Sequence, residues 1–187
     1  MSQLAPESAP ARNIAVFCAS ADGAQPIYGE VAHELGTALA TRGIGLIYGG
    51  AKVGLMRVVA DSVLASGGYV TGVIPHVLVD LEVAHQGISQ LHVVDTMHTR
   101  KALMGEKADA FLVLPGGFGT LEEMFEVLAW QTLKLHSKPT VLLNVDGFYD
   151  HLLAFCDHAV NHGILKQKNR SNLLVATTVE EALALLS

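Results

Sequence analysis

The chain has 187 residues, of which 50% are hydrophobic and 16% are charged, and its formal net charge is −6. A chain of this size and hydrophobicity can bury a full core, so we expect one domain over residues 13–187, preceded by a flexible Ala-, Pro- and Ser-rich tail over residues 1–12. The acidic balance argues against nucleic acid as a partner, no apolar run approaches the ~20 residues that span a bilayer, and we expect a cytoplasmic protein that binds neither nucleic acid nor membrane.

Short apolar runs rich in β-branched residues recur along the chain and predict strands. They lie at 13–20, 44–50, 69–75, 91–96, 110–117, 140–144 and 173–177. Segments of helical periodicity separate most of them, over 27–42, 54–66, 97–108, 120–135, 148–162 and 178–186. Alternating strands and helices predict an α/β fold: a three-layer, doubly wound, Rossmann-like domain with a mainly parallel sheet of about six or seven strands.

Two features of this pattern locate a binding site. Ligands of such sheets bind at the carboxyl ends of the strands, which selects the turns 18-CASADGAQP-26, 49-GGAKVGLM-56 and 114-LPGGFGTLEE-123. The segment 75–90 is long for a connection between a helix and a strand, and we expect it to form a rim of the pocket.

The glycine turns do not match the common nucleotide fingerprints. Glu122 stands where a dinucleotide GxGxxG motif needs its third glycine, and Leu55 and Met56 stand where a phosphate loop needs Lys and Ser or Thr. NAD binding and nucleoside triphosphate hydrolysis are therefore disfavoured. The turn before the helix at 120–135 still suits one phosphate, because glycines expose backbone amides at a helix N-terminus.

A second interpretation of the same turn needs no ligand. Thr120 and Glu123 have the spacing of a capping box, in which Thr120 begins the helix and the two side chains bond each other's backbone amides. The basic pair Arg100–Lys101 favours the ligand, because cations in the first turn of a helix oppose its dipole and a phosphate would explain them.

Several segments together resemble the LONELY GUY (LOG) family, whose members are cytokinin riboside 5'-monophosphate phosphoribohydrolases that are often mislabelled as lysine decarboxylases. They are 48-YGGAKVGLM-56, 73-VIP-75, 82-EVAH-85, 97-MHTRKALM-104, 115-PGGFGTLEE-123 and 143-LNVDGFYD-150. The resemblance implies a homodimer that hydrolyses the N-glycosidic bond of a cytokinin riboside 5'-monophosphate, or of AMP, and releases the free base and ribose 5-phosphate. The implied partner is thus a small nucleoside 5'-monophosphate, and we expect no cofactor and no metal.

The resemblance also implies a set of site residues, with Arg100 and Glu123 as the catalytic pair. The implied substrate-binding residues are Ser20, Gly49, Gly50, Glu82, Arg100, Lys101, Gly116, Gly117, Phe118, Gly119, Thr120 and Glu122. Cleavage of an N-glycoside builds positive charge on the ribose, which the Glu123 carboxylate would stabilise while it orients or deprotonates water. Arg100 would hold the phosphate or a ribose hydroxyl.

Two residues depart from the family's pattern, and three other functions stay open. Ala51 and Arg57 stand where glycine is common, so the base pocket or the packing of the following helix is expected to differ. The alternatives are an AMP nucleosidase without a cytokinin role, a non-catalytic nucleotide-binding module of the same fold, and a lysine decarboxylase. The last is disfavoured, because Lys52 has no pyridoxal-phosphate signature around it.

Overall fold

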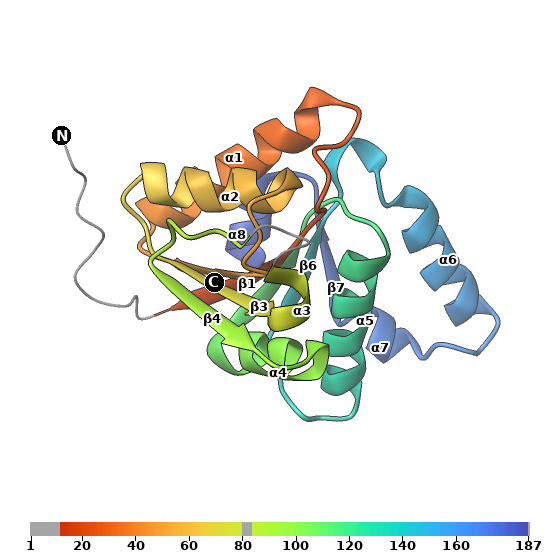
Figure 1. Cartoon of the computed structure of the whole chain (residues 1–187). Helices are drawn as coiled ribbons and strands as arrows, with labels where there is room; N and C mark the ends of the chain where they lie inside the picture. Colours follow the sequence, from red (N-terminus) through yellow and green to blue (C-terminus); the bar gives the residue numbers. More distant parts are fainter. Residues whose placement is uncertain (1–11, 80–83, 187) are drawn as a thin grey trace.

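The computed structural model describes residues 12–79 and 84–186 and confirms the predicted doubly wound α/β fold (Figure 1). Seven strands form one parallel sheet in the order β4-β3-β2-β1-β5-β6-β7. They are β1 (Asn13–Phe17), β2 (Gly45–Tyr48), β3 (Val70–Pro75), β4 (Gln90–Val94), β5 (Ala110–Val113), β6 (Thr140–Leu143) and β7 (Leu173–Ala176). Of the predicted tail, residues 1–11 lie outside the described part of the chain.

Helices cover both faces of this sheet (Figure 1). One face carries α1 (Pro26–Thr41), α2 (Gly54–Ala65) and α8 (Val179–Leu185). The other carries α4 (Met97–Lys107), α5 (Phe118–Thr132) and α6 (Asp150–Asn161). Shorter elements are α3 (His76–Val79), η1 (Val145–Gly147) and α7 (Gln167–Arg170).

The central strands are apolar throughout because both of their faces are buried. In β1, Ile14 and Val16 pack into the cluster under α1 and α2, while Ala15 and Phe17 pack into the cluster under α4 and α5. Successive side chains of a strand point to opposite faces, so a strand covered on both sides needs no polar position. This is the physical reason that continuous apolar runs predicted the strands correctly.

The order of the strands creates one topological switch point. β1 pairs with β2 on one side and with β5 on the other, and all of these pairs are parallel. The chain leaves β1 for α1 on one face of the sheet, and it leaves β5 for α5 on the opposite face. The two connections diverge and leave a crevice at the carboxyl ends of the strands, where ligands bind in this class of fold.

The segment 75–90 was expected to be a rim loop, and the structure describes part of it. Residues 76–79 form α3, and residues 84–89 lead into β4, with Ala84 bridging to Ala51 beside the end of β2. Residues 80–83, which include Glu82, lie outside the described ranges. Within those ranges, no helix is both long and apolar enough to cross a membrane.

The contact between α1 and α2 depends on a glycine, which gives a first prediction. A Cβ at Gly36 would lie 2.6 Å from both the Ser62 Cβ and the Val59 carbonyl oxygen. We expect Gly36→Ala to lower the free energy of unfolding by about 1–3 kcal/mol through overpacking. The matched control is Gly29→Ala on the same helix, where a Cβ meets nothing within 4 Å.

The control should raise the free energy of unfolding by up to about 1 kcal/mol, because alanine favours helix more than glycine does. Urea denaturation of both variants measures the difference. Equal stability of the two would contradict the close approach of α1 and α2.

Candidate active site

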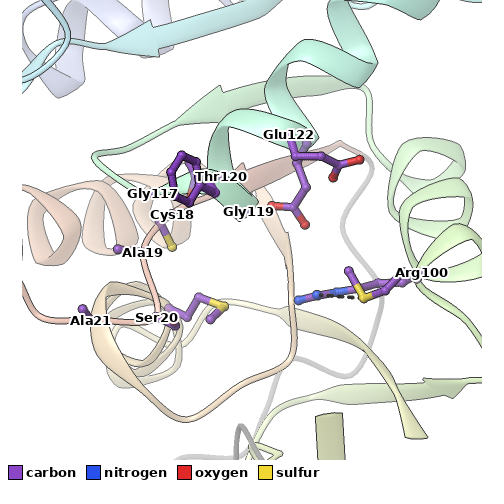
Figure 2. A pocket seen from close by; sticks show the side chains of 13 residues that line it. Cys18, Ala19, Ser20, Ala21, Arg100, Gly117, Gly119, Thr120 and Glu122 are labelled. Carbon is purple, nitrogen blue, oxygen red and sulfur yellow. Dashed lines mark hydrogen bonds between the residues drawn. The ribbon is translucent and has the colours of Figure 1, made fainter. Parts of the chain in front are cut away.

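A cavity of about 310 Å³ lies at the switch point, between the connections that follow β1 and β5. Figure 2 shows Arg100 on one side of the cavity, Ser20 and Ala21 on the other, and the start of α5 above them. The lining residues are Cys18, Ala19, Ser20, Ala21, Met56, Met97, Arg100, Gly117, Phe118, Gly119, Thr120, Glu122 and Glu123. The predicted catalytic pair therefore faces one cavity, although its two members come from different helices.

The start of α5 corrects the predicted capping box. The helix begins at Phe118, and its N-cap is Gly117, which makes no side-chain capping bond. Thr120 is thus the third residue of the helix rather than its cap, and Glu123 lies in the second turn. The amides of the first turn have no acceptor within the helix, and the residues that carry them line the cavity at the positive end of the helix dipole.

Thr120 is buried because it packs against the turn that precedes the helix. A Cβ at Gly116 would lie 2.1 Å from the Thr120 Oγ1, so the turn and the first helical residues touch closely. The same turn is held from two other directions: the Tyr149 hydroxyl donates to the Leu114 carbonyl at 2.8 Å, and the Ala19 amide donates to the Pro115 carbonyl at 3.1 Å. These contacts fix the amides of the helix start in place.

Arg100 is a buried cation that three hydrogen bonds hold in position. Its Nε donates to the Val73 carbonyl at 3.1 Å, its Nη2 donates to the Gly49 carbonyl at 3.0 Å, and its Nη1 contacts the Met97 sulfur at 3.8 Å. The side chain is 6% exposed. All three acceptors are neutral, so they orient the guanidinium without cancelling its charge, and that charge suits an anion.

Glu123 and Cys18 face each other across the cavity. Burial raises the pKa of the Cys18 thiol well above its usual value, and the nearby Glu123 charge raises it further. Cys18 is therefore a neutral thiol at physiological pH. A neutral thiol is neither an effective nucleophile nor a metal ligand, because both roles need the thiolate. Among residues 12–79 and 84–186, no group of three or more His, Cys, Asp or Glu side chains is placed to hold a metal ion.

The structure distributes the other predicted binding residues over different surroundings. Ser20, Phe118, Gly119 and Glu122 line the cavity. Gly49 and Gly50 act through their carbonyl groups, which accept hydrogen bonds from Arg100 and from the His85 amide. Neither of these glycines, nor Gly116, is among the lining residues.

Lys101 is not among the lining residues, and its side chain contacts α5. Its ammonium forms ion pairs with Glu122 and Glu126, and its side chain is 11% exposed. Burial opposes the charge, but the hydrogen bonds and charges of Glu122 and Glu126 together raise the pKa of Lys101 above its ordinary value. The two adjacent basic residues of α4 therefore have different environments.

Sequence reasoning missed five lining residues: Cys18, Ala19, Ala21, Met56 and Met97. Small or apolar residues next to strands are typical of a core, so nothing in their type distinguished them. Their position in the selected turns, or next to the basic pair, was the only available signal.

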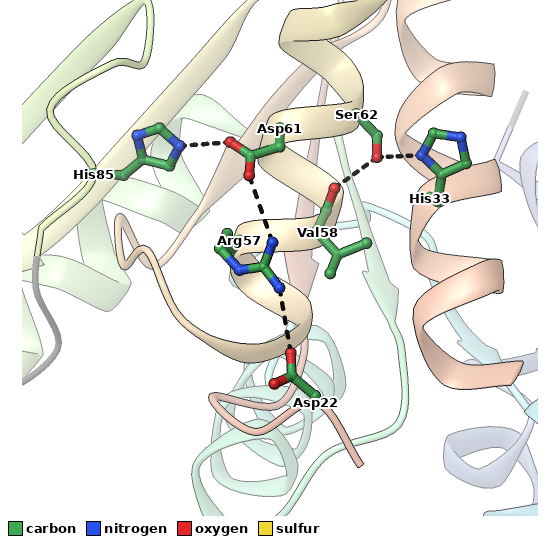
Figure 3. A network of polar contacts seen from close by, with 7 residues as sticks. All are labelled: Asp22, His33, Arg57, Val58, Asp61, Ser62 and His85. Atoms are coloured by element: carbon green, nitrogen blue, oxygen red, sulfur yellow. Dashed lines mark hydrogen bonds and ion pairs between the residues drawn. The ribbon is translucent and has the colours of Figure 1, made fainter. Parts of the chain in front are cut away.

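A network of polar side chains lies beside the cavity and includes one of the two departures from the family pattern (Figure 3). Arg57 forms ion pairs with Asp22 at 3.5 Å and with Asp61 at 3.8 Å. The His85 Nδ1 accepts from the Gly87 amide, so its Nε2 carries the proton and donates to Asp61 at 2.9 Å. The network thus connects the segments that follow β1, β2 and β3.

The other departure, Ala51, is buried, and its backbone is not in the left-handed region. Its methyl group is therefore compatible with the turn. The positive φ values of this turn are at Gly50 and Gly54.

Comparison with known proteins agrees with this geometry. A family model described as "Possible lysine decarboxylase" matches residues 56–186. A cytokinin riboside 5'-monophosphate phosphoribohydrolase of Rhodococcoides fascians is 47% identical over 174 residues, which cover 92% of this chain and 88% of that protein. The enzyme of the same name, LOG, of Oryza sativa subsp. japonica is 47% identical over 170 residues, which cover 91% of this chain and 70% of that protein.

Solved structures with the same fold are more distant in sequence. The molybdenum cofactor binding protein of Rippkaea orientalis superposes with a TM-score of 0.70 at 22% identity, covering 93% of this chain and 94% of that chain. The molybdenum cofactor carrier protein of Chlamydomonas reinhardtii gives a TM-score of 0.68 at 22% identity, covering 92% of this chain and 94% of that chain. At this level of identity the likeness shows the fold alone.

The position of Arg100 gives a second prediction. A Cβ at Gly49 would lie 2.0 Å from the Arg100 Nη2, so Gly49→Ala must displace the guanidinium. We expect the variant to lose about 1–3 kcal/mol of unfolding free energy, because buried donors and acceptors lose their partners. Urea denaturation and a crystal structure of the variant check the loss and the displacement.

The control for this variant is Gly105→Ala on α4, where a Cβ would lie 3.4 Å from the Trp130 ring, an ordinary contact. It should leave the guanidinium in place. An unmoved Arg100 in Gly49→Ala would contradict the proposed dependence on the glycine.

Proposed function

The chain belongs to the LONELY GUY (LOG) family of cytokinin riboside 5'-monophosphate phosphoribohydrolases, and we propose that it hydrolyses the N-glycosidic bond of these nucleotides and of AMP. The products are the free base and ribose 5-phosphate. The observation that carries the proposal is the meeting of a fixed guanidinium, a glycine-rich helix N-terminus and a carboxylate at one cavity.

The phosphate of the substrate is assigned to the start of α5. Gly117, Gly119 and Thr120 line the cavity there, and their backbone amides point along the positive end of the helix dipole. Glycine at two of these positions lets a phosphate approach the backbone closely. Arg100 completes the anion site or bonds a ribose hydroxyl from the opposite wall.

The carboxylate of Glu123 is assigned to the reacting carbon of the ribose. As the bond between C1' and the base nitrogen breaks, its electron pair leaves with the base and positive charge develops on the sugar. Glu123 stabilises that charge and accepts a proton from the water whose oxygen bonds to C1', and the departing base nitrogen takes up one proton, so that the elements of water are divided between ribose 5-phosphate and the free base. Arg100 acts by fixing the sugar and phosphate relative to the carboxylate.

The base is assigned to the apolar part of the cavity. Met56 and Met97 present thioethers there, and Phe118 is an aromatic side chain at the mouth that is 95% exposed. Thioethers and rings adapt to flat apolar groups, which fits a purine with an apolar N6 substituent.

Incubation with AMP and with N6-isopentenyladenosine 5'-monophosphate tests the proposal by chromatography of the released base. We expect base and ribose 5-phosphate in equal amounts from both substrates, at a higher kcat/KM for the isopentenyl compound. Release from AMP alone would instead identify an AMP nucleosidase. Binding of both without release would identify a non-catalytic module, and carbon dioxide released from lysine would identify a decarboxylase.

The two neighbouring glutamates give a third prediction. Glu123→Gln should lower kcat by about 10²–10⁴-fold, because an amide can neither accept the proton nor stabilise positive charge as a carboxylate does. Glu122→Gln is the matched control and should lose less, since its carboxylate is paired with Lys101. A larger loss at Glu122 would reverse the assignment.

We also propose that the chain forms a homodimer through the outer surface of α5, α6 and α7. Large apolar side chains are exposed there: Phe125, Leu133, Leu135, Phe155 and Ile164. Between them runs a groove of about 420 Å³, lined mainly by apolar residues of these helices and of β7. Contiguous apolar surface of this kind is typical of an interface between proteins.

A fourth prediction tests this surface with one substitution at two positions. Leu133→Glu should convert the dimer to a monomer in light scattering after size exclusion, because a buried charge without a partner opposes association. Leu185→Glu, on the opposite face of the sheet, should leave the dimer intact. A dimeric Leu133→Glu, or a monomeric wild type, would exclude this interface.

A further inference from the structure

Lys101 has an environment that differs from that of a ligand-binding lysine. Its ammonium lies 3.0 Å from the Glu126 Oε1 and also contacts the Glu122 carboxylate. Two of its three donors are thus occupied by carboxylates of α5, and its side chain is 11% exposed. A lysine held in this way binds carboxylates of its own chain.

The two glutamates need a cation between them. Glu122 and Glu126 are four residues apart on α5, so their side chains lie on the same face of the helix, and like charges at this spacing repel each other. The ammonium of Lys101 compensates both charges at once. The arrangement leaves Glu122, which lines the cavity, paired with a cation that is not among the lining residues.

The same contact joins the two helices that carry the proposed chemistry. Lys101 follows Arg100 on α4, and Glu122 precedes Glu123 on α5. Hydrogen bonds to the Gly49 carbonyl after β2 and to the Val73 carbonyl within β3 hold Arg100, and α5 carries Glu123. A direct tie between α4 and α5 therefore contributes to where the carboxylate lies relative to the guanidinium.

We propose that Lys101 is a positioning residue: it clamps Glu122 and Glu126 and so sets the distance between Arg100 and Glu123. This assignment rests on the proposed function, because it concerns the catalytic pair of that reaction. It replaces a direct contact between Lys101 and the phosphate. Glu126 is the informative partner, since it belongs to the clamp and is not among the residues that line the cavity.

The test compares Lys101→Met and Glu126→Gln with the wild type in AMP hydrolysis and in inhibition by ribose 5-phosphate. We expect each variant to lower kcat by about tenfold or more, because small displacements of catalytic groups are costly. The KM for AMP and the inhibition constant of ribose 5-phosphate should stay within about threefold, since neither Lys101 nor Glu126 is among the residues that line the cavity. Lys107→Met, the same change on the same helix, should behave like the wild type.

The double variant Lys101→Met/Glu126→Gln tests whether the two residues act through one shared contact or independently of each other. Lys101→Met removes both contacts of the clamp, including the one that Glu126→Gln removes, so the combined loss in kcat should be close to that of Lys101→Met and clearly smaller than the product of the single losses. Multiplicative losses would overturn the proposal, and so would a Glu126→Gln variant with wild-type kcat. If Lys101→Met weakens ribose 5-phosphate inhibition about tenfold while Glu126→Gln does not, Lys101 binds the phosphate instead.

A separate measurement distinguishes failure of this inference from failure of the proposed function. If the wild type releases no base, the proposed function fails. The clamp is then tested by the unfolding free energies of the wild type, Lys101→Met, Glu126→Gln and the double variant. Non-additive losses for Lys101→Met and Glu126→Gln would then support the contact between the helices. Additive losses would refute it.

Discussion

The site depends on the reversal of strand order beside β1. Because the sheet grows outward from β1 on both sides, the chain must leave β1 and β5 toward opposite faces. The two connections separate at the carboxyl edge, and the space between them becomes a cavity without any strain in the core. The start of α5 and the turn after β1 line opposite sides of the cavity, and Arg100 comes from α4, which connects β4 to β5.

Arg100 shows how an acidic chain can still present a cation to an anion. The net charge is −6, which disfavours a broad positive surface as the means of attracting a phosphate. A buried guanidinium is costly unless its donors are satisfied, and the strand-end carbonyls of Val73 and Gly49 satisfy two of them. These acceptors stabilise the orientation and leave the charge for the ligand. The glycine at 49 is required for the same reason, since a side chain there would occupy the position of the guanidinium.

The sequence predicted the fold well because burial on both faces leaves a simple pattern, as in Ile14 to Phe17. It predicted the start of α5 incorrectly because Thr120 has the type and spacing of a cap. The side chain of Thr120 packs instead against Gly116, a contact that exists only when the turn and the helix are folded together. Arg100 and Lys101 were equivalent in the sequence for a similar reason. Neighbours on a helix point about 100° apart, so tertiary partners decide which one reaches the cavity.

The same geometry gives the neighbouring carboxylates of Glu122 and Glu123 different surroundings. Both are carboxylates in one helical turn, but they have different partners. Lys101 compensates Glu122 from α4, while Glu123 faces Cys18, whose thiol stays protonated because its pKa is raised by burial and by that carboxylate. A neutral thiol adds no competing charge near the ribose. In the proposed assignment, the cavity combines a positive region at the amides and Arg100 with one carboxylate at the ribose, and hydrolysis of an N-glycosidic bond needs that separation of charge.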